Sequence, residues 1–515
     1  MEVLERTASI IVENEKIKPI PAAYIKEGEN IFLVKFDKNG NIIEKEYIGK
    51  YWWWEHIHKF STEETGKINP LTRNKGCPLS CGLCNIHKNN TALLNIVVTN
   101  RCELQCWYCF FYAERAGYIY EPSLEEILEM VDRSKEANGR YPAVQLTGGE
   151  PLLREDLLEI IKALRKKGIP HIQLNTSLVQ LGILAYNSMD NAIDYVRELR
   201  KAGLNTIYTS FDGVDPKVNF KNHYELPFAL EALKEGGVTS VVLVPTLIRG
   251  YNFPNELKNI ILFALKHREV IRGVNFQPIS FVGQASTLER EQQRVTISDL
   301  IEELEKQLGI PRFSWYPIPI VVPLLKALGK ENLGFHNNPK CGMATYIRER
   351  NGRIESIIEY LDVEKIYNAL RRFGKLGLLS FLVYSKGDLR RDVLRLAIKR
   401  DYDSAGKLHY DWTFLGVMHF MDWYNYDIKR VQRCCIHYGL PDGRIVPFCS
   451  YNVFPWLYRD KIFKQYAIKD EHILEKLRSQ TKEAIKRRAE FRSKINEIRR
   501  DPIYQKYYQA LILYQ

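Results

Sequence analysis

The sequence has no apolar run long enough to cross a membrane as a helix. Such a span needs roughly 20 uncharged residues. The longest candidates are residues 315–325, which three prolines interrupt, and residues 376–384, which are too few. The first 14 residues are charged and β-like, without the apolar stretch of a secretory signal. We therefore expect a cytoplasmic protein that is soluble or touches the cytoplasmic face of the membrane peripherally.

Internal repeats and low-complexity linkers are also absent from the 515 residues. This length exceeds that of one ordinary domain, and a hydrophobic fraction of 45% is enough for a real core. We expect a catalytic domain with smaller attached parts.

The charge is unbalanced, with a formal net charge of +12. A protein surface rich in Lys, Glu and Arg, as in hyperthermophiles, accounts for the positive charge. The alternatives are that the charge serves to bind an anionic membrane surface or a nucleic acid. The basic residues are dispersed and no RNA-binding module is visible, so no nucleic acid partner is expected. Residues 471–500 carry ten Lys/Arg against five Glu in a helical pattern. This pattern indicates a solvent-exposed helix, and the alternative is a helix that contacts anionic lipid headgroups.

Strand and helix patterns alternate between residues 92 and 285. Ser123 and Glu126 form a capping box, and two further helices, at 156–167 and 191–202, stop at a glycine. Six β/α units in a row predict an α/β fold in which a parallel sheet curls into a partial (β/α)6 barrel. Chemistry in such sheets lies at the carboxyl ends of the strands. The expected strands are residues 93–99, 143–147, 172–175, 206–211, 241–246 and 273–278.

The flanking regions show weaker patterns. Residues 29–48 predict a β-hairpin with its turn at Asn39-Gly40. The aromatic tract at 51–58 is expected to pack against the next domain, with a metal role for His56 and His58 as the alternative. Residues 290–420 read as mainly helical with a break near Cys341, and a hairpin follows around residues 442–443.

Three of the ten cysteines follow the first expected barrel strand directly. Cys102, Cys106 and Cys109 have the spacing CxxxCxxC. Three thiolates at this spacing can hold one corner of a cubane cluster and leave its fourth iron open, whereas a structural zinc site normally closes four ligands. The pattern therefore favours an iron–sulfur cluster over zinc.

These residues resemble the motif of the radical S-adenosylmethionine (SAM) superfamily, in which an aromatic residue precedes the third cysteine. Tyr108 fills that place, and Gly148, Gly149, Glu150 and Pro151 match the second motif at the end of the next strand. The resemblance implies that Cys102, Cys106 and Cys109 bind a catalytic 4Fe–4S cluster, that SAM is a cofactor, and that a ferredoxin-like protein donates electrons. Further SAM contacts are expected at Asn175, Ser210, Asp212, Thr246 and Gln277, each of which has an ordinary polar strand-end role as its alternative.

The other seven cysteines suggest two auxiliary cubane clusters. One group is a second CxxxCxxC before the barrel, and four more cysteines are scattered through the C-terminal part. The alternative for one of Cys434 and Cys435 is that it is not a ligand but a small apolar residue buried in the core. The expected auxiliary ligands are Cys77, Cys81, Cys84, Cys341, Cys434, Cys435 and Cys449.

These patterns divide the chain into five expected parts. They are an N-terminal β region at 1–60, an auxiliary iron–sulfur segment at 61–90, the partial barrel at 91–290, a C-terminal α+β auxiliary-cluster and substrate domain at 291–460, and a basic helical tail at 461–515.

Longer stretches resemble the archaeal tetraether lipid synthase family, namely residues 76–88, 276–281, 341–346, 420–427 and 435–449. The resemblance implies radical coupling of isoprenoid chain ends of an archaeal ether lipid. Family members begin with a rubredoxin-like iron knuckle, and here the corresponding residues 11–14 and 36–40 contain no cysteine. A mononuclear iron is therefore not expected, and a paralogue that cross-links chains within one tetraether is an alternative.

Other activities compete with the lipid hypothesis. Radical SAM carbon methylation of a pterin would need a polar pocket for a flat heterocycle. Peptide maturation would need a peptide-recognition element, and tRNA modification would draw on the net positive charge. An electron-transfer protein would need neither the Gly-Gly-Glu-Pro motif nor an open cluster.

Overall fold

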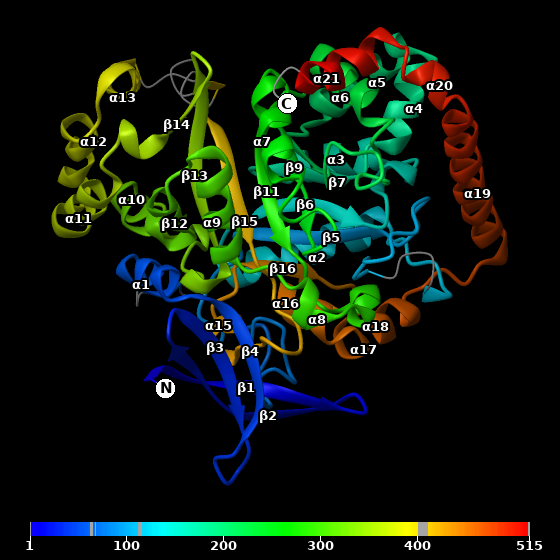
Figure 1. The fold of residues 1–515 in the computed structure, drawn as a ribbon. Coiled ribbons are helices and arrows are strands. Elements are labelled where there is room, and N and C mark those ends of the chain that lie inside the picture. The colour runs from blue at the N-terminus through cyan, green and yellow to red at the C-terminus, as the bar shows by residue number, and fades with distance from the viewer. Residues whose placement is uncertain (1, 62–64, 67, 112–115, 400–409, 513–515) are drawn as a thin grey trace.

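The N-terminal region forms a separate antiparallel sheet. The computed structural model describes residues 2–61, 65–66, 68–111, 116–399 and 410–512 (Figure 1). The first four strands pair in sequence order. They are β1 (Glu2–Glu13), β2 (Lys16–Glu27), β3 (Asn30–Phe36) and β4 (Ile42–Lys50). The predicted hairpin is β3–β4, and Gly40 in its turn has φ +87°, a conformation that favours glycine.

The second sheet runs through the rest of the molecule. Its strands are β5 (Leu93–Thr99), β6 (Ala143–Gly148), β7 (Ile172–Thr176), β8 (Thr206–Ser210), β9 (Val241–Val244), β10 (Thr246–Leu247) and β11 (Ile271–Pro278), followed by strands from the C-terminal part. The order β11-β9-β8-β7-β6-β5 is parallel throughout, and β10 pairs with β11. All six predicted barrel strands are confirmed, and the partial barrel with them.

Helices cover the outside of this curved sheet. They are α2 (Leu124–Asn138), α3 (Leu157–Lys166), α4 (Val179–Asn187), α5 (Met189–Ala202), α6 (Leu226–Glu235) and α7 (Leu257–Lys266). The capping box of Ser123 and Glu126 opens α2 as predicted. Ile96, Leu146, Leu174 and Ile207 are fully buried between strands and helices. Residues at alternating positions point the other way, into the barrel lumen.

The prediction that residues 290–420 are mainly helical is wrong in part, because the region contains four strands. They are β12 (Tyr316–Pro317), β13 (Gly342–Arg350), β14 (Arg353–Ser356) and β15 (Thr413–Met418). β15 pairs parallel with β11, and β13 pairs antiparallel with β15, so the sheet extends past residue 290. β15 is a short apolar run, and periodicity alone does not separate such a run from a buried helix. The helices here are α8 (Arg290–Gln293), α9 (Ile297–Leu308), α10 (Val322–Ala327), α11 (Val363–Phe373), α12 (Ser380–Val383) and α13 (Gly387–Lys399).

The C-terminal hairpin attaches to the opposite edge of the barrel sheet. It consists of β16 (Ile436–Gly439) and β17 (Ile445–Pro447), and it confirms the hairpin predicted around residues 442–443. β16 pairs parallel with β5, so the late cysteines lie beside the first barrel strand. Short helices flank the hairpin, namely α15 (Ile428–Val431), α16 (Phe448–Val453), α17 (Pro455–Tyr458) and α18 (Asp460–Gln465).

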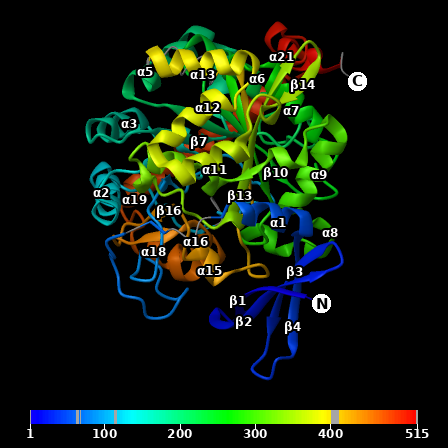
Figure 2. The same cartoon turned by 90° about the vertical axis from the view of Figure 1, so that its left-hand side faces the viewer.

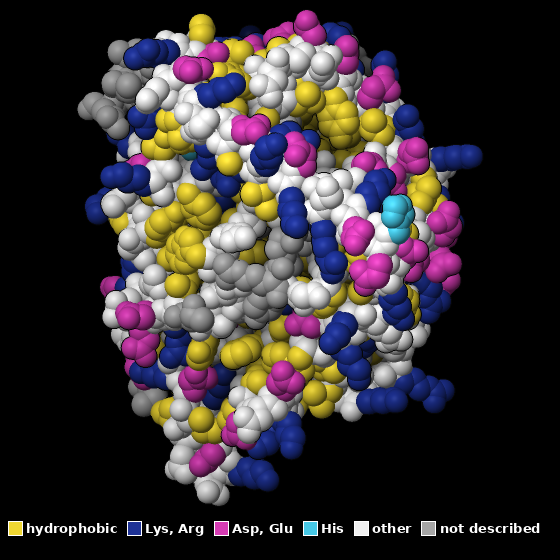
Figure 3. Space-filling view, turned by 90° about the vertical axis from the view of Figure 1, so that its right-hand side faces the viewer, with side chains coloured by type: hydrophobic (Ala, Val, Ile, Leu, Met, Phe, Trp, Pro, Cys, Tyr) yellow, Lys and Arg dark blue, Asp and Glu magenta, His cyan; other side chains and the backbone are white. Residues whose placement is uncertain are grey.

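The basic tail is helical, as predicted. It forms α19 (Glu471–Ser493), α20 (Ile495–Ile498) and α21 (Pro502–Ile512), and α19 runs along the outside of the barrel (Figure 1). Arg488 and Arg492 reach the buried carboxylate of Glu225. The side of the molecule that carries this helix shows basic and acidic side chains interspersed (Figure 3). None of the helices in the described ranges combines the length and apolarity needed to cross a bilayer.

The aromatic tract packs against later parts of the chain and shares a buried cluster with barrel residues. It forms helix α1 (Tyr51–Lys59), in which Trp53, Trp54 and Ile57 are buried. The His56 ring Nε2 lies 2.7 Å from the carbonyl of Trp315, and the His58 ring Nδ1 lies 2.7 Å from the carbonyl of Trp54. These contacts give both rings structural partners.

A buried carboxylate, Asp427, ties the N-terminal sheet to the C-terminal part. It accepts hydrogen bonds of 2.7 Å from the hydroxyls of Thr7 and Tyr24 and pairs with the Lys340 ammonium at 3.3 Å. Burial raises the pKa of Asp427, but the Lys340 charge and the hydrogen bonds more than offset this, so the pKa lies below its usual value. The carboxylate is therefore stabilised in its charged form.

We expect Asp427→Ala to lower the free energy of unfolding by about 3 kcal/mol, because it removes the acceptor of two buried hydroxyls and leaves buried Lys340 with Glu5 as its remaining carboxylate. Because the folded pKa of Asp427 is depressed, this contribution is present at neutral pH and is lost as the pH falls through the folded pKa. Thermal unfolding at several pH values measures it. Asp37→Ala, in the exposed β3–β4 turn, is the control, and an equal loss in both variants would contradict this role.

Candidate functional site

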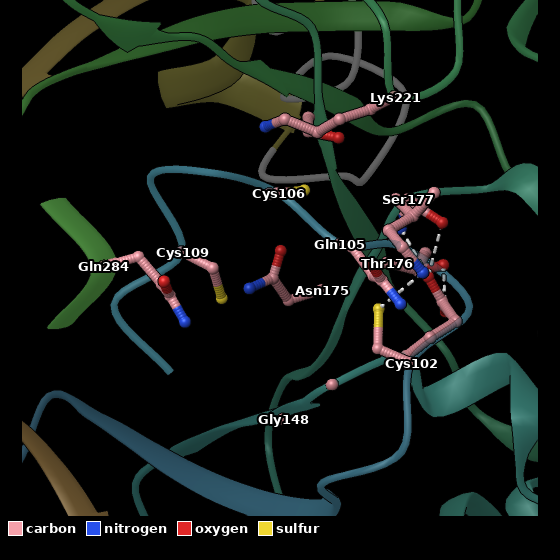
Figure 4. Close-up of a pocket in the computed structure, with 14 residues that line it drawn as sticks. Cys102, Gln105, Cys106, Cys109, Gly148, Asn175, Thr176, Ser177, Lys221 and Gln284 are labelled. Atoms are coloured by element: carbon pink, nitrogen blue, oxygen red, sulfur yellow. Dashed lines mark hydrogen bonds between the residues drawn. The ribbon is translucent and has the colours of Figure 1, made fainter. Parts of the chain in front are cut away.

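The three-cysteine loop, residues 100–109, leaves the carboxyl end of β5 and borders a cavity of about 200 Å³. Figure 4 shows the side chains of Cys102, Cys106 and Cys109 distributed around this space. Other residues lining the cavity are Leu104, Gln105, Gly148, Gly149, Glu150, Asn175, Thr176, Ser177, Ser210, Lys221 and Gln284. Both sequence motifs therefore meet at the strand ends, where the parallel sheet predicts chemistry.

The glycines of the second motif let two loops touch through their backbones. The Gly149 N–H donates to the Thr99 carbonyl at 2.8 Å, and the Glu150 N–H donates to the Arg101 carbonyl at 2.7 Å. A Cβ on Gly149 would lie 2.0 Å from the Arg101 oxygen, and a Cβ on Gly148 equally close to the Thr99 oxygen. Any side chain at these positions would therefore push the cysteine loop away.

Glu150 is buried and joins the ends of β6 and β7. Its carboxylate accepts hydrogen bonds from the Thr176 hydroxyl at 2.5 Å, from the Ser177 hydroxyl at 2.6 Å and backbone N–H at 2.7 Å, and from the Leu152 N–H at 3.0 Å. Burial raises the pKa of Glu150, and these hydrogen bonds oppose the shift. The second motif also implies that the Glu150 carboxylate binds the ammonium of the methionine part of SAM, and this contact stays a prediction. Pro151 is buried behind this turn and begins the 3₁₀ helix η2 (Pro151–Leu153).

Tyr108, the aromatic residue of the motif, belongs to a buried network with Asp212 and Lys221. The Tyr108 hydroxyl donates to Asp212, and the Lys221 ammonium lies 3.1 Å from the same carboxylate. Asp212 also accepts the Thr246 N–H at 3.0 Å. Burial raises the pKa of Cys106 to about 12, an increase that the Lys221 charge opposes. Lys221 was not predicted, although its place in the loop after β8 could have drawn attention to it.

The predicted SAM contacts fall into two groups. Asn175, Ser210, Thr246 and Gln277 line a larger cavity of about 540 Å³ that is continuous with the cysteine loop through Cys106 and Cys109. Asp212 lies behind Tyr108 and is absent from the lining of both cavities. The Ser210 hydroxyl is buried without a hydrogen-bond partner in the described part of the chain, as expected of a group that meets a polar ligand.

The larger cavity occupies the barrel lumen, and part of its wall is polar. The Gln145 amide donates to Asn95 at 2.7 Å, and the Gln173 amide donates to Gln145. These three carboxamides come from β5, β6 and β7 and form a row along one wall. Sequence reasoning missed them, although each interrupts an apolar strand. Aromatic side chains also line this cavity, including Phe110, Phe420, Tyr438 and Phe448.

The seven remaining cysteines lie in two neighbouring groups. Cys77, Cys81 and Cys84 line a small cavity together with His87. Burial raises the pKa of the Cys434 thiol, and the neighbouring sulfurs of Cys449, Cys435 and Cys341 raise it further, which identifies the second group. The Arg430 guanidinium donates to the Cys341 sulfur at 3.3 Å. Cys435 also lines the 540 Å³ cavity.

The donor set fits an iron–sulfur cluster at the three-cysteine loop. Among the residues described, no three His, Cys, Asp or Glu side chains converge as a single metal ion requires. The three thiols instead surround a cavity, and thiolates are the ligands that 4Fe–4S clusters need. Ser210 offers an unpaired polar atom beside them. These residues therefore suit a cluster and a polar cofactor.

Comparison with known proteins agrees with this chemistry. The model of the Radical SAM superfamily matches residues 96–264. A protein of Methanocaldococcus jannaschii named 7,8-dihydro-6-hydroxymethylpterin dimethyltransferase is 37% identical over 492 residues, covering 88% of this chain and 94% of the relative. GTP 3',8-cyclase 3 of Mycobacterium bovis is 30% identical over 244 residues, and the match spans 44% of this chain and 59% of the cyclase. The solved structure of methylornithine synthase matches 42% of this chain and 62% of its own, with a TM-score of 0.31 and 18% identity.

The fold, the three-cysteine loop and the family model define a radical SAM protein, with a SAM-binding 4Fe–4S cluster and SAM as cofactors. Within that superfamily, the chain belongs to the same family as the M. jannaschii relative. The comparisons do not name the tetraether lipid synthase family, so that closer assignment stays a prediction.

Replacing Cys106 with Ala should abolish reductive cleavage of SAM, because the two remaining thiolates do not suffice to hold the open cluster. Cleavage is measured as the 5'-deoxyadenosine that the anaerobically reconstituted protein forms, quantified by chromatography. Cys449→Ala, which changes a buried cysteine outside the loop, is the control and should retain cleavage. Unaltered cleavage in Cys106→Ala would remove the loop from its assigned role.

Proposed function

We propose that this chain uses radical SAM chemistry to methylate carbon atoms of a dihydropterin. The proposal is supported by the relative at 37% identity, whose name describes that activity and which this chain matches over nearly its whole length. It also meets the structural requirement that a flat, polar heterocycle imposes, a cavity with hydrogen-bonding walls.

The observation that carries the proposal is the carboxamide row of Asn95, Gln145 and Gln173 in the lumen. A carboxamide both donates and accepts, so a row of them can pair with the alternating N–H, N and C=O groups of a pterin edge. The cavity volume of about 540 Å³ is in the range of small-molecule sites. The same cavity reaches Cys106, so a heterocycle held on this wall would face the radical-generating loop.

Each part of the site then has a defined task. When bound at Cys102, Cys106 and Cys109, the cluster would supply the electron for reductive cleavage of one SAM, which would remove a hydrogen atom from the pterin carbon. A second SAM would supply the methyl group and leave as S-adenosylhomocysteine, with a second electron from the external reductant. Gly148 and Gly149 let the cysteine loop approach closely, and Glu150 holds the ends of β6 and β7 in register. Asp212 orients Tyr108 and Lys221 at the wall of the cavity. The enclosed lumen keeps water away from the reacting carbon.

Two auxiliary clusters form part of the proposal. Cys77, Cys81 and Cys84 would hold one, and Cys341, Cys434, Cys435 and Cys449 the other. The second group includes Cys435, which lines the cavity beside β5, the strand that carries Asn95 of the amide row. The Arg430 guanidinium beside Cys341 stabilises thiolate charge there, as expected near an anionic cluster.

Radical coupling of isoprenoid chains, including cross-linking within one tetraether, is the second candidate. The aromatic residues of the cavity lining favour it, because Phe420 and Phe448 stack at 4.0 Å between ring centroids and present an apolar surface. An alkyl chain would pack there without using the carboxamides. The two candidates therefore differ in their need for the polar row.

Incubating the reconstituted protein with SAM, a reductant and 7,8-dihydro-6-hydroxymethylpterin should yield pterins heavier by one or two methylene units. Gln145→Leu should lower this methylation about tenfold, because it removes a hydrogen bond to the bound ring. Mass spectrometry of the products gives the result. Gln292→Leu, the same change at an exposed position of α8, should leave the yield unaltered.

A parallel incubation with an isoprenoid diether lipid separates the two candidates. Lipid coupling without pterin turnover would contradict the pterin proposal, as would recovery of ether lipid instead of a pterin from the purified protein. Methylation that is insensitive to Gln145→Leu would remove the amide row from its assigned role.

Three cubane clusters predict about twelve irons per chain after anaerobic reconstitution. Cys449→Ala should lower this number by about four, because one auxiliary cluster loses a ligand. Iron analysis of both proteins tests the assignment. Fewer than about eight irons in the unaltered chain would contradict two auxiliary clusters.

A further inference from the structure

The surface between residues 373 and 398 exposes large apolar side chains. Leu376 and Ile398 are each 72% exposed, and Leu379 and Val383 are each 62% exposed. Scattered exposed apolar residues are normal in soluble proteins, but a concentration of them marks an interaction surface. With Phe373 and Leu394, these residues define what we call the docking face.

Four residues of the docking face form one continuous stripe. The 3₁₀ helix η9 (Gly374–Leu379) leads directly into α12, and residues three apart lie on the same side of a 3₁₀ helix. Phe373, Leu376 and Leu379 are thus aligned, and Val383 follows one turn later. The stripe has no internal packing task, since all four side chains point to solvent.

The opposite side of the same segment makes the structural contacts. Leu378, Phe381 and Tyr384 pack against a buried cluster that contains Ile366 and Leu370. The segment is therefore apolar on both its inner and its outer side. A helix that is apolar all round belongs in an apolar environment, and here water covers only its outer side.

Basic residues surround the docking face. Residues 371–399 contain eight Lys/Arg and two Asp. Asp388 pairs with Arg348 and Arg350, and Asp392 is buried, so neither presents a free acidic charge. The exposed basic side chains are Arg371, Arg372, Lys375, Lys386, Arg390, Arg391, Arg395 and Lys399. A partner for this surface must therefore combine apolar groups with negative charge.

The docking face lies on the outer side of the substrate cavity wall. Figure 2 shows α11, α12 and α13 together on one side of the molecule. Behind them, α10 contacts both η9 and the 3₁₀ helix η5 (Ile318–Val321). Ile318 of η5 lines the 540 Å³ cavity. α10 and η5 thus lie between the docking face and the lumen.

We propose that the docking face binds peripherally to an anionic lipid bilayer. Leucine and phenylalanine flanked by Lys and Arg is the composition of segments that lie in the membrane interface, where apolar side chains enter the acyl boundary and cations meet the headgroups. An acidic protein partner would match the charge, but it would bury this stripe only with a matching apolar groove. The proposal concerns a surface apart from the cysteine loop and is independent of which substrate the enzyme takes.

Flotation of the full-length holoenzyme with vesicles tests the proposal. Vesicles of phosphatidylcholine with about one third phosphatidylglycerol should carry the protein, and vesicles of phosphatidylcholine alone should carry much less. The triple variant L376S/L379S/V383S should bind anionic vesicles about tenfold more weakly, since it removes the apolar insertion. K375E/R391E should weaken binding similarly at low salt, because it removes attraction to the headgroups.

The matched control is I473S/I485S, the same kind of change at exposed apolar positions of α19, and it should bind as the unaltered protein does. All variants should retain 5'-deoxyadenosine formation, which verifies that they fold. Absence of vesicle binding by the unaltered protein would overturn the proposal. So would equal loss in the control, or self-association in size-exclusion chromatography that the triple variant abolishes without any vesicle binding, since a second copy would then be the partner.

Discussion

Backbone lies directly against backbone where the loop after β5 meets the Gly148–Gly149 turn. Two hydrogen bonds, from Gly149 to Thr99 and from Glu150 to Arg101, fix the loop at a distance that admits no side chain. Glu150 then transmits this position to the end of β7 through three hydrogen bonds. The direction in which the three thiols face the cavity depends on this contact, and so does the position of any cofactor that they hold.

The cavity wall combines two kinds of side chain. Carboxamides of β5, β6 and β7 are polar, and aromatic residues from the C-terminal part are apolar. This combination follows from topology, because β16 pairs with β5 and β15 pairs with β11, so the late part of the chain closes both edges of the parallel sheet. The auxiliary cysteines reach the cavity by the same route, since Cys435 immediately precedes β16. A reactive intermediate formed at Cys106 would thus be enclosed by walls contributed from both halves of the sequence.

Local patterns predicted the barrel, and long-range pairing limited the rest. The strand beginning at Leu93 and the capping box at Ser123 are set by residues close in sequence, so they could be read directly. β15 could not, because its partner β11 lies well over 100 residues earlier and a short apolar run carries no periodicity. Gln145 was missed for a related reason, since only closure of the sheet turns an interrupted strand into a polar wall. The cysteine motifs were readable because cluster ligation requires particular residues at fixed spacing.

The central claim is that Cys102, Cys106 and Cys109 hold an iron–sulfur cluster to which SAM binds directly. Electron paramagnetic resonance of the anaerobically reduced protein, recorded with and without SAM, tests it most directly. The account predicts a reduced 4Fe–4S signal whose spectrum changes when SAM is added. A spectrum that SAM does not change, or zinc in place of iron at this loop, would contradict the claim.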